Sequence, residues 1–205
     1  LHSLAGIYIH IPFCKQACTY CNFHFSASLA LKDKMIEAIV REVGLTRSFS
    51  ETGEKISSIY FGGGTPSILP VADIKLILEK LHEKFQVESN AEITLEANPD
   101  DIEMQKPEQW QEAGINRLSL GVQSFVESEL AWMNRAHHAD ESLRSIKRIR
   151  EAGFTNFSAD LIFGSPRQSN DDLTRSLAIL CEEDVPHISC YTGTMESNTA
   201  LFNMI

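Results

Sequence analysis

The whole chain is organised around one short segment, Tyr8-Ile9-His10-Ile11-Pro12-Phe13-Cys14-Lys15-Gln16-Ala17-Cys18-Thr19-Tyr20-Cys21. An apolar strand runs directly into three cysteines with the spacing C-x3-C-x2-C, so their sulfurs can converge on one centre. Zinc and iron–sulfur clusters both take cysteine thiolates as ligands. A structural zinc site needs four ligands, and no second C-x2-C or His pair follows here. The segment therefore favours an iron–sulfur cluster with one iron open to a ligand from outside the protein, over three incidental buried cysteines.

Composition limits the class of protein. The chain has 205 residues, of which 43% are hydrophobic and 22% charged, and these values are typical of a globular domain. A net charge of −10 argues against nucleic acid as a partner. No apolar run approaches the roughly 20 residues of a membrane span, and Leu1-His2-Ser3 does not resemble the start of an export signal. We therefore expect a cytoplasmic protein without a membrane span.

Five cysteines, three of them clustered, indicate metal ligation in a reducing compartment rather than a disulfide framework. The two remaining cysteines, Cys181 and Cys190, are expected in the core or in a strand.

Strand and helix patterns alternate along the chain. Strands are expected over 6–12, 56–61, 91–97, 117–122, 157–163 and 187–194. Helical segments are expected over 29–48, 71–85, 107–114, 126–133, 140–152 and 171–183, with Asp140 as an N-cap. This order predicts an α/β fold with a parallel sheet built from βαβ units.

Polar residues follow successive strands at the same end. Cys14 follows the first strand, three glycines and Thr65 follow the second, Glu96 and Gln123 close the third and fourth, and Asp160 lies in the fifth. Functional groups at the carboxyl ends of parallel strands are typical of βα-barrels. Six units predict a partial (β/α)6 barrel, and we expect residues 1–205 to form a single domain.

The loop Gly62-Gly63-Gly64-Thr65-Pro66 would allow a ligand amine or carboxylate to reach bare backbone, and a tight turn is the alternative. Glu96 lies in a strand that otherwise reads as buried, where an ionised carboxylate needs a partner. That partner would be a bound cation, a ribose hydroxyl, or an internal Lys or Arg. Gln123 and Asp160 follow the same reasoning.

Further polar residues leave alternatives open. Arg135 would pair with Asp160 or with a ligand carboxylate. His10 would face the barrel interior beneath the metal or would be a satisfied core histidine. His137 and His138 are expected to be surface loop residues.

These residues together resemble the radical S-adenosylmethionine (SAM) proteins, and within them the oxygen-independent coproporphyrinogen III oxidase branch. The resemblance spans nearly the whole chain. It rests on the cysteine segment and on Gly62-Gly-Gly-Thr-Pro66, Glu96-Ala-Asn-Pro99, Gly121-Val-Gln-Ser124, Asn134-Arg135 and Asp160-Leu-Ile-Phe-Gly164.

The resemblance implies that Cys14, Cys18 and Cys21 hold a [4Fe–4S] cluster and that SAM chelates the fourth iron. The SAM pocket implied in this way is lined by Tyr8, Tyr20, Gly63, Gly64, Thr65, Glu96, Gln123, Arg135 and Asp160. The implied chemistry is reductive cleavage of SAM to methionine and a 5′-deoxyadenosyl radical, driven by a low-potential electron donor.

The resemblance also discriminates between branches. The oxidases carry one more cysteine two positions after the third, whereas this chain has Phe23 after Asn22. Phe23 favours the heme chaperones of the HemW type, which bind heme and pass it to partner proteins. The alternative is an oxidase that forms protoporphyrinogen IX from coproporphyrinogen III by radical oxidative decarboxylation, and a third is a radical SAM enzyme with an unrelated substrate.

The family normally continues beyond the sixth strand into a C-terminal domain. We therefore expect that part of the family fold to be missing here, and no heme ligand is assigned in this chain.

Overall fold

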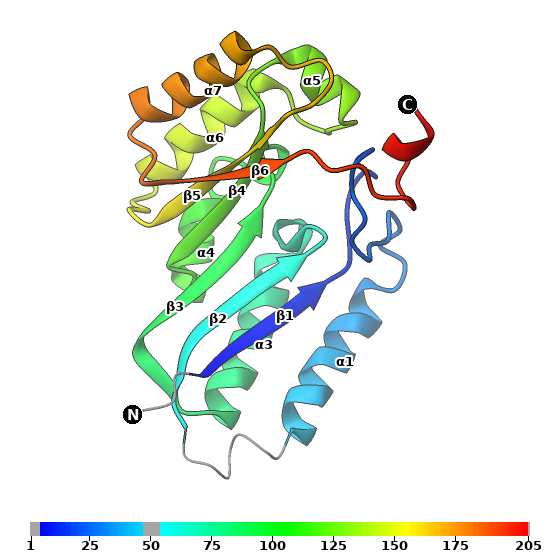
Figure 1. Cartoon of the computed structure of the whole chain (residues 1–205). Helices are drawn as coiled ribbons and strands as arrows, with labels where there is room; N and C mark the ends of the chain where they lie inside the picture. Colours follow the sequence, from blue (N-terminus) through cyan, green and yellow to red (C-terminus); the bar gives the residue numbers. More distant parts are fainter. Residues whose placement is uncertain (1–4, 47–53, 205) are drawn as a thin grey trace.

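The computed structural model describes residues 5–46 and 54–204 (Figure 1). The predicted helix end at Ser48 and the start Leu1–Ser3 lie outside these ranges. The strands are β1 (Ala5–Ile11), β2 (Ile56–Gly63), β3 (Val87–Ala97), β4 (Arg117–Gln123), β5 (Phe157–Phe163) and β6 (His187–Thr192). The α-helices are α1 (Lys32–Leu45), α3 (Val71–Lys84), α4 (Lys106–Ala113), α5 (Glu127–Trp132), α6 (Ala139–Glu151) and α7 (Asn170–Glu182). Short 3-10 turns are η1 (Pro66–Ile68), η2 (Pro99–Asp101) and η3 (Leu201–Asn203).

All six strands belong to one parallel sheet in the order β1-β2-β3-β4-β5-β6. The strands fan out in Figure 1, and β1 and β6 are the two edges of the sheet. Parallel neighbours require crossover connections, and the helices between the strands supply them. The structure thus confirms the predicted α/β class and the partial six-unit barrel.

The core lies between the sheet and the helices that follow its strands. Helix α3 carries an apolar stripe at helical spacing. The four side chains of this stripe are buried, namely Ile74, Ile77, Leu78 and Leu81. Central strands contribute Phe61, Leu95 and Leu120, each fully buried. Burying one such side chain stabilises the fold by about 1.5–3 kcal/mol. Because the strands are all parallel, their carboxyl ends lie at one rim of the sheet.

Helix α6 begins differently from the prediction. Asp140 was expected as the N-cap, but the helix starts at Ala139 and the cap residue is His138. The backbone N–H of His138 donates to Glu141 Oε2 at 2.8 Å, which is one half of a capping box. Glu127 accepts the backbone N–H of Ala139 at 2.8 Å. The prediction was wrong because Glu127 of α5, 12 residues earlier in the chain, accepts a hydrogen bond from the first turn and the helix begins one residue sooner.

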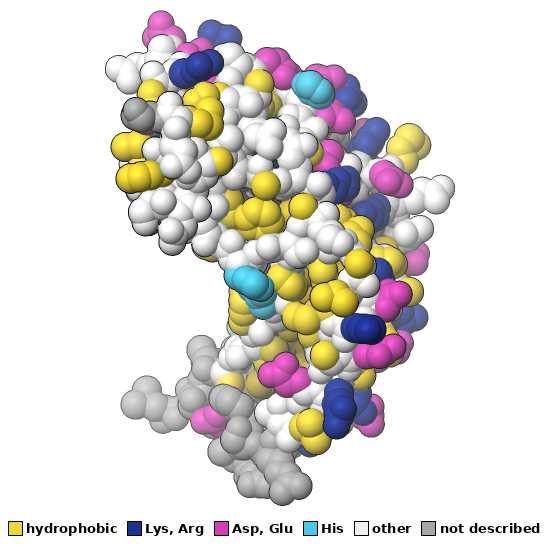
Figure 2. All heavy atoms as spheres, turned by 90° about the vertical axis from the view of Figure 1, so that its right-hand side faces the viewer, with side chains coloured by type: hydrophobic (Ala, Val, Ile, Leu, Met, Phe, Trp, Pro, Cys, Tyr) yellow, Lys and Arg dark blue, Asp and Glu magenta, His cyan; other side chains and the backbone are white. Residues whose placement is uncertain are grey.

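The segment after β6 crosses to the loop that follows β1, where the two lie side by side in Figure 1. The backbone N–H of Leu201 donates to Thr19 O at 2.8 Å, and the Leu201 side chain is buried. Figure 2 shows hydrophobic side chains gathered across the middle of this face, and exposed ones on the two segments include Phe23, Met195 and Phe202. Among the described residues, no helix is both long and apolar enough to cross a membrane.

Candidate functional site

A cavity of about 440 Å³ opens at the carboxyl ends of the strands. Its size falls in the range of small-molecule sites. All three cysteines of the N-terminal segment line it. Eight of the nine other predicted site residues line it too: Tyr20, Gly63, Gly64, Thr65, Glu96, Gln123, Arg135 and Asp160.

Cys14, Cys18 and Cys21 reach the cavity from the loop between β1 and α1. Backbone hydrogen bonds shape this loop, from Cys14 N to Ser26 O at 3.0 Å and from Cys21 N to Cys18 O at 3.3 Å. Burial raises the pKa of the Cys14 and Cys21 thiols. Within residues 5–46 and 54–204, no three His, Cys, Asp or Glu side chains are grouped closely enough to hold one metal ion. A four-iron cluster differs, because each thiolate binds a separate iron, and three thiols on one cavity wall fit it.

The glycines of β2 allow two loops to meet. The N–H of Gly64 donates to Ile11 O at 2.8 Å. A Cβ at position 64 would lie 2.7 Å from Phe13 O and 3.0 Å from Cys14 Sγ. Gly63 has φ +114°, which a side chain rarely tolerates. The sequence suggested bare backbone for a ligand, and the structure adds that this backbone also presses against the cysteine loop.

Glu96 is held by neutral donors. Tyr60 Oη donates to Glu96 Oε1 at 2.8 Å, and the N–H of Gly63 donates to Oε2 at 3.2 Å. An internal Lys or Arg was the alternative partner for Glu96, and that interpretation was wrong. Burial raises the pKa of Glu96, although these two hydrogen bonds lower it in part. The carboxylate therefore has no neutralising cation from the described residues and retains lone pairs for another donor.

Arg135 does not pair with Asp160, which was one of its two predicted partners. Its Nη2 donates to Asn98 Oδ1 at 2.7 Å and to Gly121 O at 2.9 Å. Its Nη1 lies 3.4 Å from Cys18 Sγ and 3.3 Å from Tyr20 Oη. The buried Nε atom has no hydrogen-bond partner among the described residues. Arg135 thus places a positive charge between the cysteine loop and the cavity.

Asp160 of β5 and Gln123 of β4 also line the cavity. Ser119 Oγ donates to Asp160 Oδ2 at 3.3 Å, whereas Asp160 Oδ1 is buried without a partner in the described part of the chain. Burial raises the pKa of Asp160. Gln123 ends β4 with φ 68°, a conformation uncommon for a residue with a side chain. Strained backbone of this kind is concentrated at functional sites.

Of the two tyrosines predicted in the SAM pocket, only one lines the cavity. Tyr20 lines the cavity, and burial raises its pKa, so its phenol stays protonated. Tyr8 is not among the residues that line the cavity, and its ring stacks on Tyr60 with centroids 6.1 Å apart. Tyr8 Oη and His10 Nδ1 lie 3.2 Å apart, and His10 Nε2 lies 3.3 Å from His24 O. The chain itself thus satisfies the half-buried His10.

Two further sequence predictions are corrected, and a third is confirmed. His137 was expected at the surface, but only 2% of it is exposed and its Nε2 lies 2.9 Å from Val122 O. Burial, with the nearby Arg135, lowers the pKa of His137 to about 4. Cys181 was expected in the core or in a strand and is exposed on α7. Cys190 was expected in the core or in a strand, and its position in β6 confirms this prediction, with the residue exposed. Their surroundings are decided by packing that one sequence does not reveal.

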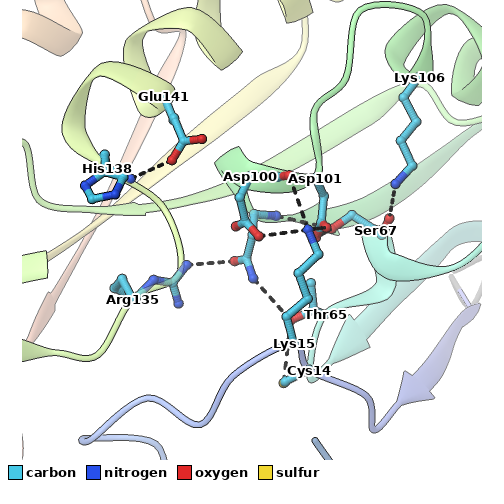
Figure 3. Close-up of polar contacts among 11 residues, drawn as sticks. Cys14, Lys15, Thr65, Ser67, Asp100, Asp101, Lys106, Arg135, His138 and Glu141 are labelled. Carbon is cyan, nitrogen blue, oxygen red and sulfur yellow. Dashed lines mark hydrogen bonds and ion pairs between the residues drawn. The ribbon is translucent and has the colours of Figure 1, made fainter. Parts of the chain in front are cut away.

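Sequence reasoning assigned no role to Asn98 or Lys15. Asn98 accepts from Arg135 and donates from Nδ2 to Thr65 Oγ1 at 3.2 Å, so it links two walls of the cavity. Lys15 pairs with Asp100 and Asp101 of η2 (Figure 3). Asn98 lies just after β3 and before Pro99, so its place at a strand end could have marked it as a candidate site residue. Nothing in the sequence indicated the partners of Lys15.

Known proteins resemble this chain in sequence. The family model of the radical SAM superfamily matches residues 8–180. The heme chaperone HemW of Escherichia coli is 36% identical over 199 residues, which cover 95% of this chain and 52% of that protein. HemW of Bacillus subtilis is 36% identical over 206 residues, covering 98% and 54%.

Among solved structures, coproporphyrinogen III oxidase (HemN) from Escherichia coli, described as a radical SAM enzyme, superposes with a TM-score of 0.84 and 30% identity. The superposition covers 92% of this chain and 44% of that one. The chain thus spans about half the length of the curated relatives it matches. Because the family model matches most of the chain, from Tyr8 in β1 into α7, the chain belongs to the radical SAM superfamily.

Proposed function

We propose that this chain holds a [4Fe–4S] cluster through Cys14, Cys18 and Cys21 and binds SAM in the adjoining cavity. One observation carries the proposal: three thiols and eight residues expected from sequence at a SAM pocket line a single cavity at the strand ends. Membership of the radical SAM superfamily, which implies both groups, supports it. All five cysteines are free thiols in the structure, and we propose a reducing, cytoplasmic setting for a chain that acts as one domain.

Different residues of the cavity would bind different parts of SAM. The bare backbone at Gly63 and Gly64 would receive the amine of SAM, and Arg135 would supply positive charge near its carboxylate. Glu96 and the unpartnered oxygen of Asp160 would accept hydrogen bonds from hydroxyl or ammonium groups. Tyr20 and Gln123 would complete the pocket. When bound, the cluster supplies the single electron for reductive cleavage of SAM.

We further propose that the whole protein is a heme chaperone. The proteins named HemW are its relatives at 36% identity, and Phe23 stands where the oxidases carry a further cysteine. The Phe23 side chain is 68% exposed and lines the cavity, which suits contact with a flat apolar ligand. Its partners would then be heme, a low-potential electron donor and heme-accepting proteins. The second candidate is coproporphyrinogen III oxidation, favoured by the TM-score of 0.84 to HemN.

The cluster is tested by anaerobic reconstitution followed by iron and sulfide counting. We expect close to four irons per chain, and near-zero iron in each of Cys14→Ala, Cys18→Ala and Cys21→Ala. Cys190→Ala is the matched control, because this exposed thiol lies in β6 away from the loop, and it should retain full iron content. Stoichiometric zinc in the wild-type protein would contradict the proposal.

Two assays separate the chaperone from the oxidase. A heme titration should show saturable binding and subsequent transfer to an apo-heme protein. An anaerobic assay with coproporphyrinogen III, SAM and a reductant should yield no protoporphyrinogen IX. Robust formation of that product would instead establish the oxidase, and SAM cleavage coupled to a different product would reveal a third reaction.

A further inference from the structure

A charged cluster lies beside the cysteine loop, on the side of η2 (Figure 3). Lys15, the residue immediately after Cys14, extends its Nζ to Asp101 Oδ1 at 2.5 Å and to Asp100 Oδ2 at 2.9 Å. The same Nζ also donates to the backbone oxygen of Asp100 at 3.2 Å. One lysine thus makes three polar contacts with a turn 85 residues further along the chain.

Asp101 is buried, whereas the Lys15 side chain that pairs with it is 43% exposed. Asp101 is only 2% exposed, and its second oxygen accepts Ser67 Oγ at 2.6 Å. A carboxylate so removed from water needs a cation and full hydrogen bonding. Lys106 is the other nearby lysine, but its Nζ donates to Ser67 O at 2.7 Å rather than to Asp101. The cysteine loop therefore supplies the cation that this buried acid requires.

A hydrogen-bond chain returns from the same acid to the cysteine. Ser67 Oγ, which donates to Asp101, accepts the backbone N–H of Asn98 at 3.2 Å. Asn98 Nδ2 donates to Thr65 Oγ1 at 3.2 Å, and Thr65 Oγ1 lies 3.5 Å from Cys14 Sγ. The Cys14 thiol therefore contacts Thr65 directly, and the residue after it in the chain, Lys15, is anchored to Asp101.

The other half of the loop is anchored without an ion pair. Gln16 Nε2 donates to Asn134 O and Oδ1 at 2.8 and 2.9 Å, and Asn134 Nδ2 donates to Ala17 O at 2.7 Å. Thr19 N donates to Met133 O at 3.0 Å. These bonds involve uncharged groups. Backbone hydrogen bonds hold the Cys14 end as well, from Cys14 N to Ser26 O at 3.0 Å and from Thr65 N to Phe13 O at 2.7 Å, and Lys15 adds an ion pair with a buried acid at that end.

We propose that Lys15 is a positioning residue: its ion pair with Asp101 fixes the Cys14 end of the loop, with the thiol facing the cavity, before any cluster is present. The inference rests on the proposed function only in naming the cluster as what the thiol receives. It assigns the Lys15 side chain to holding a ligand residue in place and not to contact with SAM or substrate.

The test uses the full chain with four variants. Lys15→Met breaks the pair, Lys15→Arg keeps the charge, and the double variant Lys15→Met/Asp101→Asn removes the stranded carboxylate charge. Lys75→Met is the matched control, because Lys75 lies on α3 in an exposed contact with Glu79 at 3.9 Å. The readouts are the melting temperature, the alkylation rate of each cysteine in the apo protein by mass spectrometry, and the rate of iron loss to a chelator. The exposed thiols Cys181 and Cys190 serve as internal references.

We expect Lys15→Met to alkylate at Cys14 several-fold faster and to lose iron several-fold faster than wild type. Lys15→Arg and Lys75→Met should behave as wild type. The double variant should regain the melting temperature lost in Lys15→Met while Cys14 alkylation and iron loss remain fast.

The inference is overturned if the double variant restores all three readouts, because Lys15 would then only neutralise Asp101. Unchanged Cys14 alkylation in Lys15→Met also overturns it. A wild-type chain that takes up no iron, with the expected alkylation pattern in the apo variants, would refute the cluster proposal and leave this inference standing.

Discussion

One buried carboxylate lies beside the cysteine loop and two half-buried carboxylates line the cavity, and their partners differ. Asp101 on η2 is paired with Lys15 at 2.5 Å and with Ser67 at 2.6 Å. Within the part of the chain that the structure describes, Glu96 on β3 and Asp160 on β5 receive hydrogen bonds only from hydroxyl and backbone N–H groups. Burial raises the pKa of both Glu96 and Asp160.

The difference separates scaffold from binding surface. A buried carboxylate that the chain neutralises is satisfied by folding alone, so it stabilises the loops it joins. A buried carboxylate without a cation carries a cost in the apo protein, which a ligand with hydroxyl or ammonium groups can offset. Asp160 Oδ1, buried and without a partner within the described residues, is the clearest example. Variants that remove one carboxylate at a time test this difference.

The largest stability effect is expected at the neutralised acid. Asp101→Ala should lower the free energy of unfolding of the apo protein by about 3 kcal/mol, because hydrogen bonds to a charged group contribute about 1.5–3 kcal/mol each. Denaturant unfolding measures this change. The control is Glu79→Ala, which removes an exposed carboxylate and should change stability little. If both variants were equally stable, Asp101 would not be part of the scaffold.

The second effect is on binding rather than on stability. Glu96→Gln should keep its iron content and a near-native melting temperature but weaken SAM binding by about 1.5–3 kcal/mol, or roughly ten- to a hundredfold, because charge-assisted hydrogen bonds are lost. A SAM titration of the reconstituted protein measures it. An unchanged titration curve together with a much lower melting temperature would show that Glu96 stabilises the fold, as Asp101 does, and does not bind SAM.

The smallest effect is a pH dependence of the apo protein. Raised pKa values mean that the folded state favours protonated Glu96 and Asp160, so this contribution to stability is present below their ordinary values of 4.5 and 3.8 and is lost as pH rises through the folded values. The double variant Glu96→Gln/Asp160→Asn should lack this loss. Unfolding free energies of both proteins across pH 4 to about 7 measure the difference. Parallel curves would show that neither carboxyl is destabilised by burial.

Much of the fold follows from local pattern. The apolar stripe of α3 was predicted residue by residue, because helical spacing puts one face against the sheet. Strand β3 was predicted from Ala91 but begins at Val87, where the polar residues before Ala91 hide the strand pattern and pairing with β2 extends it. The burial of His137 was missed because the fold directs its ring to Val122 O.

The cysteine spacing, the glycines at the end of β2 and the polar residues at the strand ends could be identified without a structure, because such signals depend on residue type and on positions close in the chain. Which charged groups pair could be learned only from the folded chain. Lys15 forms an ion pair with Asp101. Arg135 donates a hydrogen bond to Asn98 and not to Asp160, and Glu96 accepts one from Tyr60 and not from a cation. These pairings join segments far apart in the chain, and their strength depends on burial and distance, which a linear pattern does not contain.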